Sequence, residues 1–446
     1  MRSTQVSGLL TDLYQFTMLQ GYLESHMDEV AVYEFFVRKL PPRRNFLVAA
    51  GLESVLDYLL TVRFAPDEIR FLEKTGRFNR RFLDYLENFS FSGDVYAMPE
   101  GRVFFPDEPI LRITAPILEA QLIETRIINL LHYQTLVASK AARVVLAAPN
   151  RLLVDFGLRR AHGAEAALLG ARAAFIAGFH GSSNVLAEHL FGIPSYGTMA
   201  HSFIQAHDDE AAAFEHFAHA QPGNVVLLID TYDTEAAAEK VVRLAPRLKA
   251  AGIAIRAVRI DSGDLADHAK KVRRILDAGG LKDTGIFASG NLDEYEIQRL
   301  LAQDAPITGF GVGTRMLTSS DAPYLDCAYK LMEYAGHARR KRSEGKATWP
   351  GRKQVYRTYD GEGRMAGDTL CLDSEGYTGE PLLQMVMKEG KRTAHLPGLA
   401  EARKLCAQDL LRLPEALKSL DGAPPYPVTV SRGLKEMAAA VDEHRA

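Results

Sequence analysis

The chain has 446 residues, which is enough for two or three domains with a large core. Its 53 Lys and Arg residues nearly balance 56 Asp and Glu residues, so no bulk charge favours nucleic acid or an anionic membrane as a partner. Three distant cysteines without a Cys-x-x-Cys pair argue against a disulfide framework and a structural zinc site. We see no signal peptide and no apolar run of membrane length, and therefore expect a cytoplasmic protein.

Residues 1–118 are predicted to form a mixed α+β domain. Its first helix, over residues 11–20, is either an ordinary capped helix or one that presents Tyr14 as an exposed aromatic. Further elements follow in chain order. They are a strand at 30–37, helices at 52–60 and 66–75, short strands and turns over 95–113, and a long helical stretch with one break over 120–148.

The sequence pattern changes near residue 152. From there, short apolar runs that end in polar or glycine residues alternate with amphipathic helices. The runs are too apolar to have a wet face, so we expect parallel strands that are buried on both sides. The repetition predicts an incomplete (β/α) barrel of about seven parallel strands within residues 119–328, rather than an open sheet. The predicted strands are 152–154, 174–177, 193–196, 225–229, 253–260, 285–288 and 307–310.

Residues 329–446 are predicted to form a small β-rich module followed by a helix over 400–420. The module opens with a strand-like run at 329–334. The basic run Arg339–Arg342 that follows is interpreted as a solvated loop, because four residues are too few to indicate nucleic-acid binding.

Two loops at the ends of late strands have the composition of phosphate-binding loops. Gly311-Val312-Gly313-Thr314 lets backbone N–H groups approach phosphate oxygens and adds the hydroxyl of Thr314. Ser289-Gly290-Asn291, one strand earlier, is chemically similar, and late barrel strands often build a phosphate site. Glycines in a late strand also occur for tight packing, so this alternative stays open at Gly311 and Gly313.

Charged side chains stand at other strand ends. Asp261 and Asp264 flank a Ser-Gly pair and are suited to sugar hydroxyls or to Mg²⁺; the alternative is that this segment only caps the next helix. Arg159 and Arg259 are the cations best placed to meet an acid group.

The segment Tyr196–Ser202 combines Gly197, Thr198 and His201, whose side chains can donate, accept or carry a covalent group. The alternative interpretation of His201 is a buried histidine that is satisfied by a hydrogen bond. The position of the segment at a strand end, where ligands of such folds bind, favours a functional role.

Several common chemistries are not indicated. No His-x-His stands at a strand end, and the lysines between residues 240 and 282 lie in or just after helices, which weakens metal-hydrolase and Schiff-base interpretations. No Walker A sequence is present, so any ATP must bind without a P-loop.

Five motifs in order resemble the nicotinate phosphoribosyltransferase family, a group of type II phosphoribosyltransferases. They are Thr11–Met18, Phe156–Arg160, Gly197–Ser202, Arg259–Leu265 and Gly311–Thr314. The resemblance extends from about Leu9 to the C-terminal helix. It implies an incomplete barrel packed against a domain built from N- and C-terminal segments, and a homodimer whose active sites contain residues of both subunits.

The resemblance also implies a reaction, the first step of NAD salvage from nicotinate. Nicotinate and 5-phosphoribosyl 1-diphosphate would give nicotinate mononucleotide and diphosphate, with Mg²⁺ as cofactor. ATP would be hydrolysed to ADP and phosphate through a phosphorylated histidine. The partners implied are these small molecules, without nucleic acid or membrane.

Residue roles follow from the motif positions. The resemblance implies that His201 is the phosphorylated residue, that Tyr14 stacks on the pyridine ring, and that Thr198 and Arg259 lie near the nicotinate carboxylate. It further implies that Gly311, Gly313 and Thr314 hold the ribose 5-phosphate, that Arg159 meets the diphosphate, and that Asp261 and Asp264 contact the ribose or Mg²⁺.

Two alternatives stay open. One is the same chemistry on nicotinamide or quinolinate, although the Thr11–Gln15 segment is more similar to the nicotinate enzymes. The other is a non-catalytic barrel that binds phosphorylated ligands, which is expected to have lost His201 or Asp261.

Overall fold

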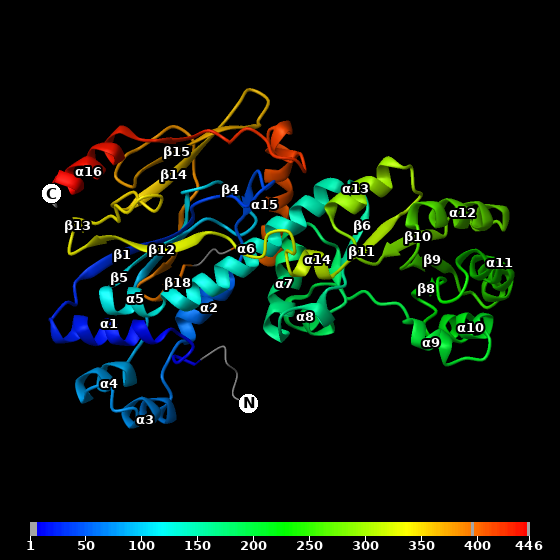
Figure 1. The fold of residues 1–446 in the computed structure, drawn as a ribbon, viewed down its shortest axis with the longest axis horizontal. Helices are drawn as coiled ribbons and strands as arrows, with labels where there is room; N and C mark the ends of the chain where they lie inside the picture. The colour runs from blue at the N-terminus through cyan, green and yellow to red at the C-terminus, as the bar shows by residue number, and fades with distance from the viewer. Residues whose placement is uncertain (1–6, 394–396, 444–446) are drawn as a thin grey trace. The chain divides into compact units, whose positions relative to one another are not determined.

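The computed structural model describes residues 7–393 and 397–443. The chain divides into two compact units (Figure 1). We name Met1–Ser139 with Tyr324–Ala446 the terminal unit, and Lys140–Pro323 the central unit. The first boundary lies within helix α6 (Glu124–Ala147), whereas the sequence prediction placed the boundaries after residues 118 and 328.

The main sheet of the terminal unit is antiparallel and has seven strands in the order β13-β12-β1-β5-β3-β17-β18. Three strands come from the first part of the chain and four from the last part, so both ends build one sheet. Their bounds are β1 (Val30–Val37), β3 (Asp94–Ala97), β5 (Pro109–Pro116), β12 (Cys327–Tyr334), β13 (His337–Ala338), β17 (Gln384–Lys388) and β18 (Lys391–Arg392). The predicted strand at 30–37 is confirmed as β1, whose Val and Phe side chains are buried beyond its first residue.

Two smaller sheets complete the β structure of the terminal unit. One pairs β2 (Leu47–Val48) with β4 (Val103–Phe104). The other has the order β16-β14-β15-β19, with β14 (Lys353–Tyr359), β15 (Met365–Leu372), β16 (Glu380–Pro381) and β19 (Val428–Val430).

The predicted helices of the terminal unit are confirmed in type and position, whereas α4 and α16 were not predicted. The long helical stretch has its break at Ile123, between α5 and α6. The bounds are α1 (Leu13–Glu24), α2 (Leu52–Thr61), α3 (Pro66–Lys74), α4 (Arg80–Glu87), α5 (Ile117–Leu122), α15 (Leu399–Arg412), the 3₁₀ helix η3 (Glu415–Lys418) and α16 (Arg432–Glu443).

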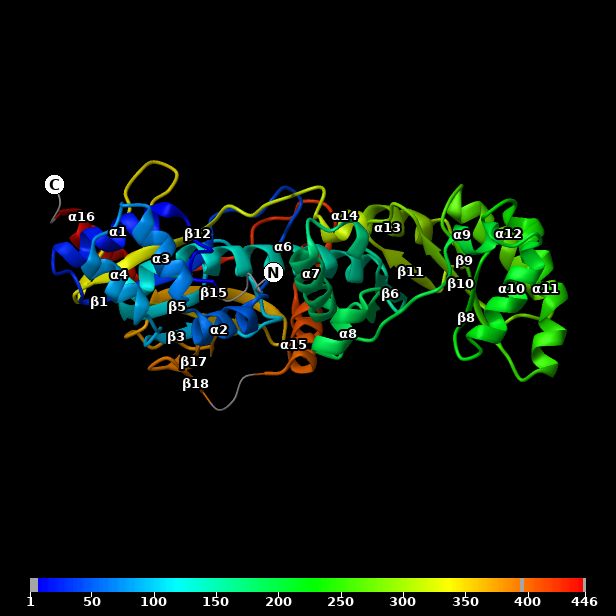
Figure 2. The same cartoon turned by 90° about the horizontal axis from the view of Figure 1, so that it is seen from below.

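The central unit contains a six-stranded parallel sheet, a half-barrel, in the order β7-β6-β11-β10-β9-β8. Its strands are β6 (Leu152–Asp155), β7 (Gly181–Ser182), β8 (Val225–Leu228), β9 (Ile255–Ile260), β10 (Gly285–Ser289) and β11 (Gly309–Val312). The helices are η2 (Leu158–Arg160), α7 (Ala164–Ala177), α8 (Val185–Phe191), α9 (His201–Gln205), α10 (Glu210–Ala220), α11 (Thr234–Ala250), α12 (Leu265–Ala278), α13 (Glu294–Ala302) and α14 (Thr314–Leu317). Helices α10, α11 and α12 lie side by side against β8, β9 and β10 (Figure 2).

Two of the seven predicted strands are wrong. Residues 174–177 are the last turn of α7, because their alanine-rich sequence favours a helix, and the strand follows at β7. Residues 193–196 form only an isolated bridge between Ser195 and Ser182, since Pro194 has no N–H to donate to a ladder. The remaining five predicted strands are confirmed as β6, β8, β9, β10 and β11.

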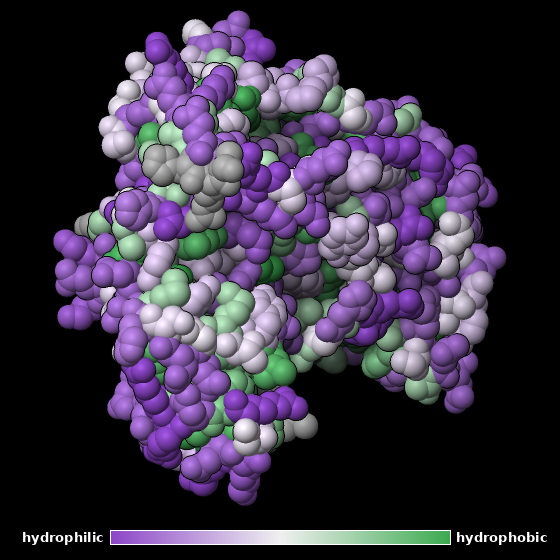
Figure 3. Space-filling view, turned by 60° about the vertical axis from the view of Figure 1, so that its left-hand side comes forward, coloured by the Kyte–Doolittle hydropathy of each residue, from purple (hydrophilic) through white to green (hydrophobic). Residues whose placement is uncertain are grey.

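The face drawn in Figure 3 is mainly polar, with apolar side chains scattered among polar ones. Among the helices of the described residues, none has the length and apolar character that crossing a membrane requires.

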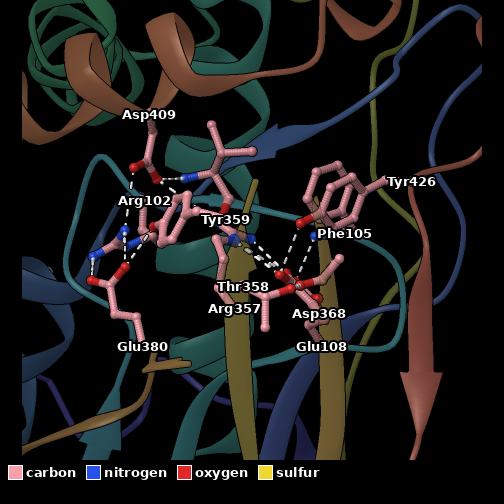
Figure 4. A network of polar contacts seen from close by, with 12 residues as sticks. Arg102, Phe105, Glu108, Arg357, Thr358, Tyr359, Asp368, Glu380, Asp409 and Tyr426 are labelled. Carbon is pink, nitrogen blue, oxygen red and sulfur yellow. Dashed lines mark hydrogen bonds and ion pairs between the residues drawn. The ribbon is translucent and has the colours of Figure 1, made fainter. Parts of the chain in front are cut away.

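A buried charge network connects strands and loops of the terminal unit (Figure 4). Arg357 on β14 and Asp368 on β15 are direct cross-strand partners, and both side chains are fully buried. The guanidinium donates to Asp368 through Nε at 3.0 Å and through Nη2 at 2.6 Å, and Nη1 donates to the carbonyl of Val103 at 2.9 Å. The hydroxyl of Tyr426 donates to the same carboxylate at 3.0 Å. These bonds fix the end of the chain to a strand of the N-terminal segment.

A second arginine extends the network. Arg102 pairs with Asp409 at 3.2 Å and with Glu380 at 2.5 Å, and the hydroxyl of Tyr359 donates to Glu380 at 2.6 Å. Asp409 lies on α15, so this pair joins a C-terminal helix to an N-terminal loop.

Glu108 lies in the same network without an arginine of its own. Its Oε2 accepts the N–H of Phe105 at 2.8 Å, whereas the buried Oε1 meets no conventional donor from the described residues. Burial raises the pKa of Glu108 well above the usual carboxyl range, and the charge of Asp368 and a hydrogen bond to it act in the same direction. The raised pKa favours the protonated form of Glu108 beside the carboxylate of Asp368.

Candidate active site

A cavity of about 610 Å³ opens at the carboxyl ends of β6, β9, β10 and β11 and at the segment 196–201, and every residue that lines it belongs to the central unit. This is the edge of a parallel sheet at which ligands bind, because the loops there converge. The cavity gathers most of the predicted site residues. They are Arg159, Thr198, His201, Arg259, Asp261, Ser289, Gly290, Asn291, Gly311, Gly313 and Thr314.

Arg259 lies near the end of β9, and all three nitrogens of its guanidinium donate hydrogen bonds to the protein. Its Nε donates to Ser289 at 2.9 Å, Nη1 donates to Thr198 at 3.0 Å and to the carbonyl of Met199 at 3.3 Å, and Nη2 donates to Asp261 at 2.9 Å. The ring of Phe156 lies 5.5 Å from the guanidinium carbon. A guanidinium has five N–H donors, so these four bonds leave one donor of Nη2 for a ligand.

Asp261 follows two residues later, on the same side of the chain. Its Oδ1 accepts hydrogen bonds from Arg259 and from the hydroxyl of Ser289. Burial by itself raises the pKa of Asp261, but these hydrogen bonds and the charges of Arg259 and His201 outweigh it, so the pKa lies below its ordinary value. The carboxylate is therefore ionised at neutral pH.

His201 begins α9 and is not a buried structural histidine, since its side chain is 40% exposed. Its Nδ1 lies 3.1 Å from the hydroxyl of Thr231, and its Nε2 lies 4.0 Å from Oδ2 of Asp261. One ring nitrogen is thus held by the protein, and the imidazole lines the cavity beside a carboxylate.

Both loops with phosphate-binding composition lie at the cavity, and their glycines have identifiable structural reasons. Gly290 has φ +96°, and a side chain there would place its Cβ 2.1 Å from the carbonyl of Asp261. A Cβ at Gly311 would lie 2.4 Å from the ring of Phe156. Tight packing therefore accounts for Gly311, as the alternative stated, and it also leaves the backbone open toward the cavity.

Arg159 stands in the 3₁₀ turn η2 together with Arg160, which the prediction had not singled out. Both side chains are exposed and line the cavity. In the described part of the chain neither guanidinium has a hydrogen-bond or ion-pair partner, so both are available to an anionic ligand. The adjacent Arg-Arg pair was the signal by which Arg160 could have been found.

Asp264 does not line the cavity. Its Oδ1 accepts the N–H groups of Ala266 and Asp267 at 3.1 and 3.2 Å, so it caps α12. Capping is the role that the structure shows for Asp264, and a role in binding Mg²⁺ stays a prediction.

Tyr14 belongs to the terminal unit and is 47% exposed on α1, so the sequence-based idea of a presented aromatic fits its environment. The next residue, Gln15, is buried and donates to Glu124 at 3.2 Å while it accepts from Gln121 at 2.6 Å. This contact anchors α1 to α5 and α6.

Sequence reasoning missed two residues that hydrogen-bond to the site residues, Asp230 and Thr231. Oδ2 of Asp230 accepts the N–H of Asp261 at 3.0 Å and the hydroxyl of Ser262 at 2.6 Å. Thr231, next to it, holds His201. Both follow β8 after Ile229, and their position behind a strand was the available signal.

The fold and the site define a class: a parallel half-barrel protein with a cavity lined by exposed arginines, a carboxylate held by an arginine, and a histidine. Three family models match the chain. They describe the nicotinate phosphoribosyltransferase N-terminal domain over residues 9–132, the nicotinate phosphoribosyltransferase family over residues 152–339, and the C-terminal domain of that enzyme over residues 375–438.

Relatives from bacteria are similar over most of their length. The chain is 50% identical over 428 residues to nicotinate phosphoribosyltransferase pncB2 of Mycobacterium tuberculosis, covering 96% of this chain and 92% of that one. It is 38% identical to the nicotinate phosphoribosyltransferase of Bacillus subtilis, over 85% and 79% of the two chains. The crystal structure of human nicotinic acid phosphoribosyltransferase superposes with a TM-score of 0.87 at 29% identity, over 97% and 100%.

The chain belongs to the nicotinate phosphoribosyltransferase family and is an enzyme.

Proposed function

We propose that this enzyme joins nicotinate to 5-phosphoribosyl 1-diphosphate, the phosphoribosyl donor, giving nicotinate mononucleotide and diphosphate, and that it couples this step to ATP hydrolysis through His201. The observation that carries the proposal is the position of Arg259, which is fixed by four bonds at the cavity with one N–H donor left over. A planar cation with a remaining donor suits the carboxylate of nicotinate. The names of the bacterial relatives support the same substrate.

Nicotinate needs no general base from the protein in order to react. The pyridine nitrogen of nicotinate has a free electron pair, so it attacks the anomeric carbon of the ribose without a general base. As the bond to diphosphate breaks, positive charge develops on the ribose and negative charge on the leaving group. The ionised carboxylate of Asp261 stabilises the first charge, and Arg159 with Arg160 stabilises the second.

The 5-phosphate of the phosphoribosyl donor is assigned to the glycine-containing loops. Ser289, Gly290 and Asn291 follow β10, and Gly311, Gly313 and Thr314 surround the end of β11, the neighbouring parallel strand. The two loops together offer backbone N–H groups and hydroxyls to one anionic group.

The site fits Mg²⁺ through a single carboxylate oxygen. Oδ2 of Asp261 accepts no hydrogen bond from the described residues, and those residues contain no group of three His, Cys, Asp or Glu side chains that could enclose a metal. Mg²⁺ commonly uses one or two carboxylates together with substrate phosphates and water. When bound, the ion supplies positive charge to the diphosphate leaving group, and Asp261 is the residue that would hold it.

ATP enters the proposal through the imidazole of His201. A ring nitrogen attacks the γ-phosphorus of ATP, ADP leaves, and the phosphohistidine is later hydrolysed to phosphate. The side chain is sufficiently exposed for this role. The added negative charge lies beside Asp261 and near Arg259, so it would change how these groups are paired.

We infer further that the enzyme is a homodimer with shared active sites, in which Tyr14 stacks on the pyridine ring. The exposure of Tyr14 on α1 supports its part in this inference. Sedimentation equilibrium should give twice the chain mass of 49.3 kDa; a monomer that retains full activity would contradict shared sites.

The first experiment measures product formation from the phosphoribosyl donor and Mg²⁺ with nicotinate, nicotinamide or quinolinate, each with and without ATP. We expect nicotinate mononucleotide, formed faster when ATP is present. Turnover of nicotinamide or quinolinate instead would overturn the assignment of Arg259. Absence of turnover with all three would favour a binding protein.

The role of His201 is tested by His201→Ala. This variant should not incorporate phosphate from γ-labelled ATP and should retain slow synthesis that ATP does not accelerate. His207→Ala is a matched control, since His207 lies outside the cavity lining and contacts His216 and the carbonyl of Phe203. Stimulation by ATP that survives in His201→Ala would exclude His201 as the phosphoryl acceptor.

A further inference from the structure

The last residue of β6 carries a buried carboxylate that the proposed reaction does not use. Asp155 is 1% exposed and does not line the cavity. Its partners among the described residues are hydrogen-bond donors without charge, Gly157 and Ser182. Burial raises its pKa to about 6, even though both hydrogen bonds act in the opposite direction. An ionisable group in such a position costs stability unless it holds something in place.

Each oxygen of Asp155 holds a different loop. Oδ1 accepts the N–H of Gly157 at 2.8 Å, and Oδ2 accepts the hydroxyl of Ser182 at 2.7 Å. The carbonyl of Asp155 accepts the N–H of Ser183 at 2.8 Å, and the oxygen of Ser182 accepts the N–H of Asn184 at 3.1 Å. One aspartate thus connects the loops that follow two neighbouring parallel strands.

Both loops reach the cavity although Asp155 does not. Gly157 accepts the N–H of Arg160 at 2.9 Å and so starts the turn that carries Arg159 and Arg160, while Ser183 lines the cavity from the other loop. Because neither guanidinium has a partner in the described structure, only the backbone of this turn determines where the two charges stand. The N–H of Gly157, fixed by Asp155, is the start of that turn.

We propose that Asp155 is a positioning residue for the phosphoribosyl donor, which holds the turn of residues 157–160 so that Arg159 and Arg160 meet the diphosphate. This inference rests on the proposed function. It predicts that loss of Asp155 affects the donor much more than nicotinate, because Arg259 and Thr198, the groups proposed to bind nicotinate, are hydrogen-bonded to each other and make no hydrogen bond to Asp155. If the role of Asp155 were purely structural, its loss would weaken the binding of both substrates.

The test compares Asp155→Ala, Asp155→Asn and Ser182→Ala in the full-length enzyme by steady-state kinetics. Asp155→Ala should raise the KM for the phosphoribosyl donor about tenfold or more and change the KM for nicotinate by less than about twofold. Asp155→Asn should restore the donor KM to within about threefold of wild type, because its carbonyl accepts from Gly157 and its amide donates to Ser182. Ser182→Ala removes one of the two bonds, and should raise the same KM by about two- to fivefold.

Asp209→Ala is the matched control. Asp209 caps α10 by accepting the N–H of Ala212 at 3.0 Å and does not line the cavity, so its loss tests a general effect on stability. Both KM values should stay at the wild-type level in this variant. Equal increases of both KM values in Asp155→Ala, or an unchanged donor KM, would overturn the inference. If Asp155→Ala does not fold, an unchanged donor KM in Ser182→Ala overturns it.

Calorimetric titration of the phosphoribosyl donor without nicotinate separates this inference from the proposed function. Binding to the wild type that is at least tenfold weaker in Asp155→Ala supports the inference without any turnover. Equal binding by both enzymes contradicts the inference alone. Absence of binding to the wild type contradicts the proposed function and the inference with it.

Discussion

Each unit contains a hydrogen-bonded Arg–Asp pair, and the two pairs have opposite surroundings. Arg357 and Asp368 in the terminal unit are 2.6 Å apart and both fully buried. Arg259 and Asp261 in the central unit are 2.9 Å apart, and their side chains are 12% and 26% exposed. The first pair joins two antiparallel strands as direct neighbours, whereas the second lies along one strand end at a cavity.

The difference shows how the same chemistry serves structure or ligand binding. Around Arg357, protein groups occupy the guanidinium, and water has no access to compensate for a lost partner. Around Arg259, four bonds fix the guanidinium and one donor remains available. Loss of the buried arginine should therefore reduce stability, and loss of the arginine at the cavity should reduce activity.

The largest expected effect is on the buried pair. Arg357→Met leaves the buried carboxylate of Asp368 without its cation, while Asp409 keeps Arg102, and this should lower the free energy of unfolding by about 3–5 kcal/mol. Urea denaturation followed by circular dichroism measures it. Arg299→Met removes an exposed i,i+3 pair with Glu296 and should cost less than about 0.5 kcal/mol. Equal shifts of the urea midpoint in Arg357→Met and Arg299→Met would show that the buried pair stabilises the fold no more than an exposed pair does.

The second effect is on catalysis at the open pair. Arg259→Ala should lower kcat/KM for nicotinate by about 10- to 100-fold, since a charge-assisted hydrogen bond to the carboxylate is lost. The KM for nicotinate should rise much more than the KM for the phosphoribosyl donor. Arg259→Lys should not restore activity, because an ammonium group cannot make the same four bonds.

A urea titration of Arg259→Ala completes the comparison. Its midpoint should shift less than that of Arg357→Met. A larger shift would mean that Arg259 is mainly structural, and equal changes in both KM values would move it to another role.

A third effect concerns the pH dependence of stability in the terminal unit. Glu108 has a pKa raised well above its usual value, so the folded state holds a proton that the unfolded state releases. Its stabilising contribution is complete below the ordinary carboxyl pKa and is lost as pH rises through the raised one, by at most about 1.4 kcal/mol per pH unit. Glu108→Gln should show a flatter profile than wild type from about pH 5 upward when urea midpoints are compared. Identical profiles would exclude the shared proton.

The smallest effect is expected at the exposed aromatic of the terminal unit. Tyr14→Ala should raise the KM for nicotinate about two- to tenfold, which is the range for one aromatic stacking contact, while the donor KM stays unchanged. Tyr14→Phe keeps the ring and should behave like wild type. A KM for nicotinate that is unaffected by Tyr14→Ala would show that the ring does not contact the pyridine.

Local sequence was sufficient for most elements and for the composition of the site. The Val- and Phe-rich run of β1 and five of the six strands in the parallel sheet follow from apolar patterning and from the turn residues that end each run. Because the carboxyl ends of parallel strands share one edge, the residues at the ends of β6, β9, β10 and β11 were expected to meet, and the cavity confirms it.

The tertiary structure alone decided which partner each polar side chain takes. Asp261 and Asp264 are three residues apart and chemically identical, yet one binds Arg259 and the other caps α12. Residues 174–177 are too few for their apolar pattern to distinguish a strand from a helix, and they continue α7, as their alanine content favours. Asp155 stands at the end of a predicted strand, but neither there nor at Asp368 did the sequence show the partner, since Ser182 and Arg357 lie on other elements of the fold. Patterning within one segment determines its conformation, whereas the partners of a buried charge depend on contacts between distant segments.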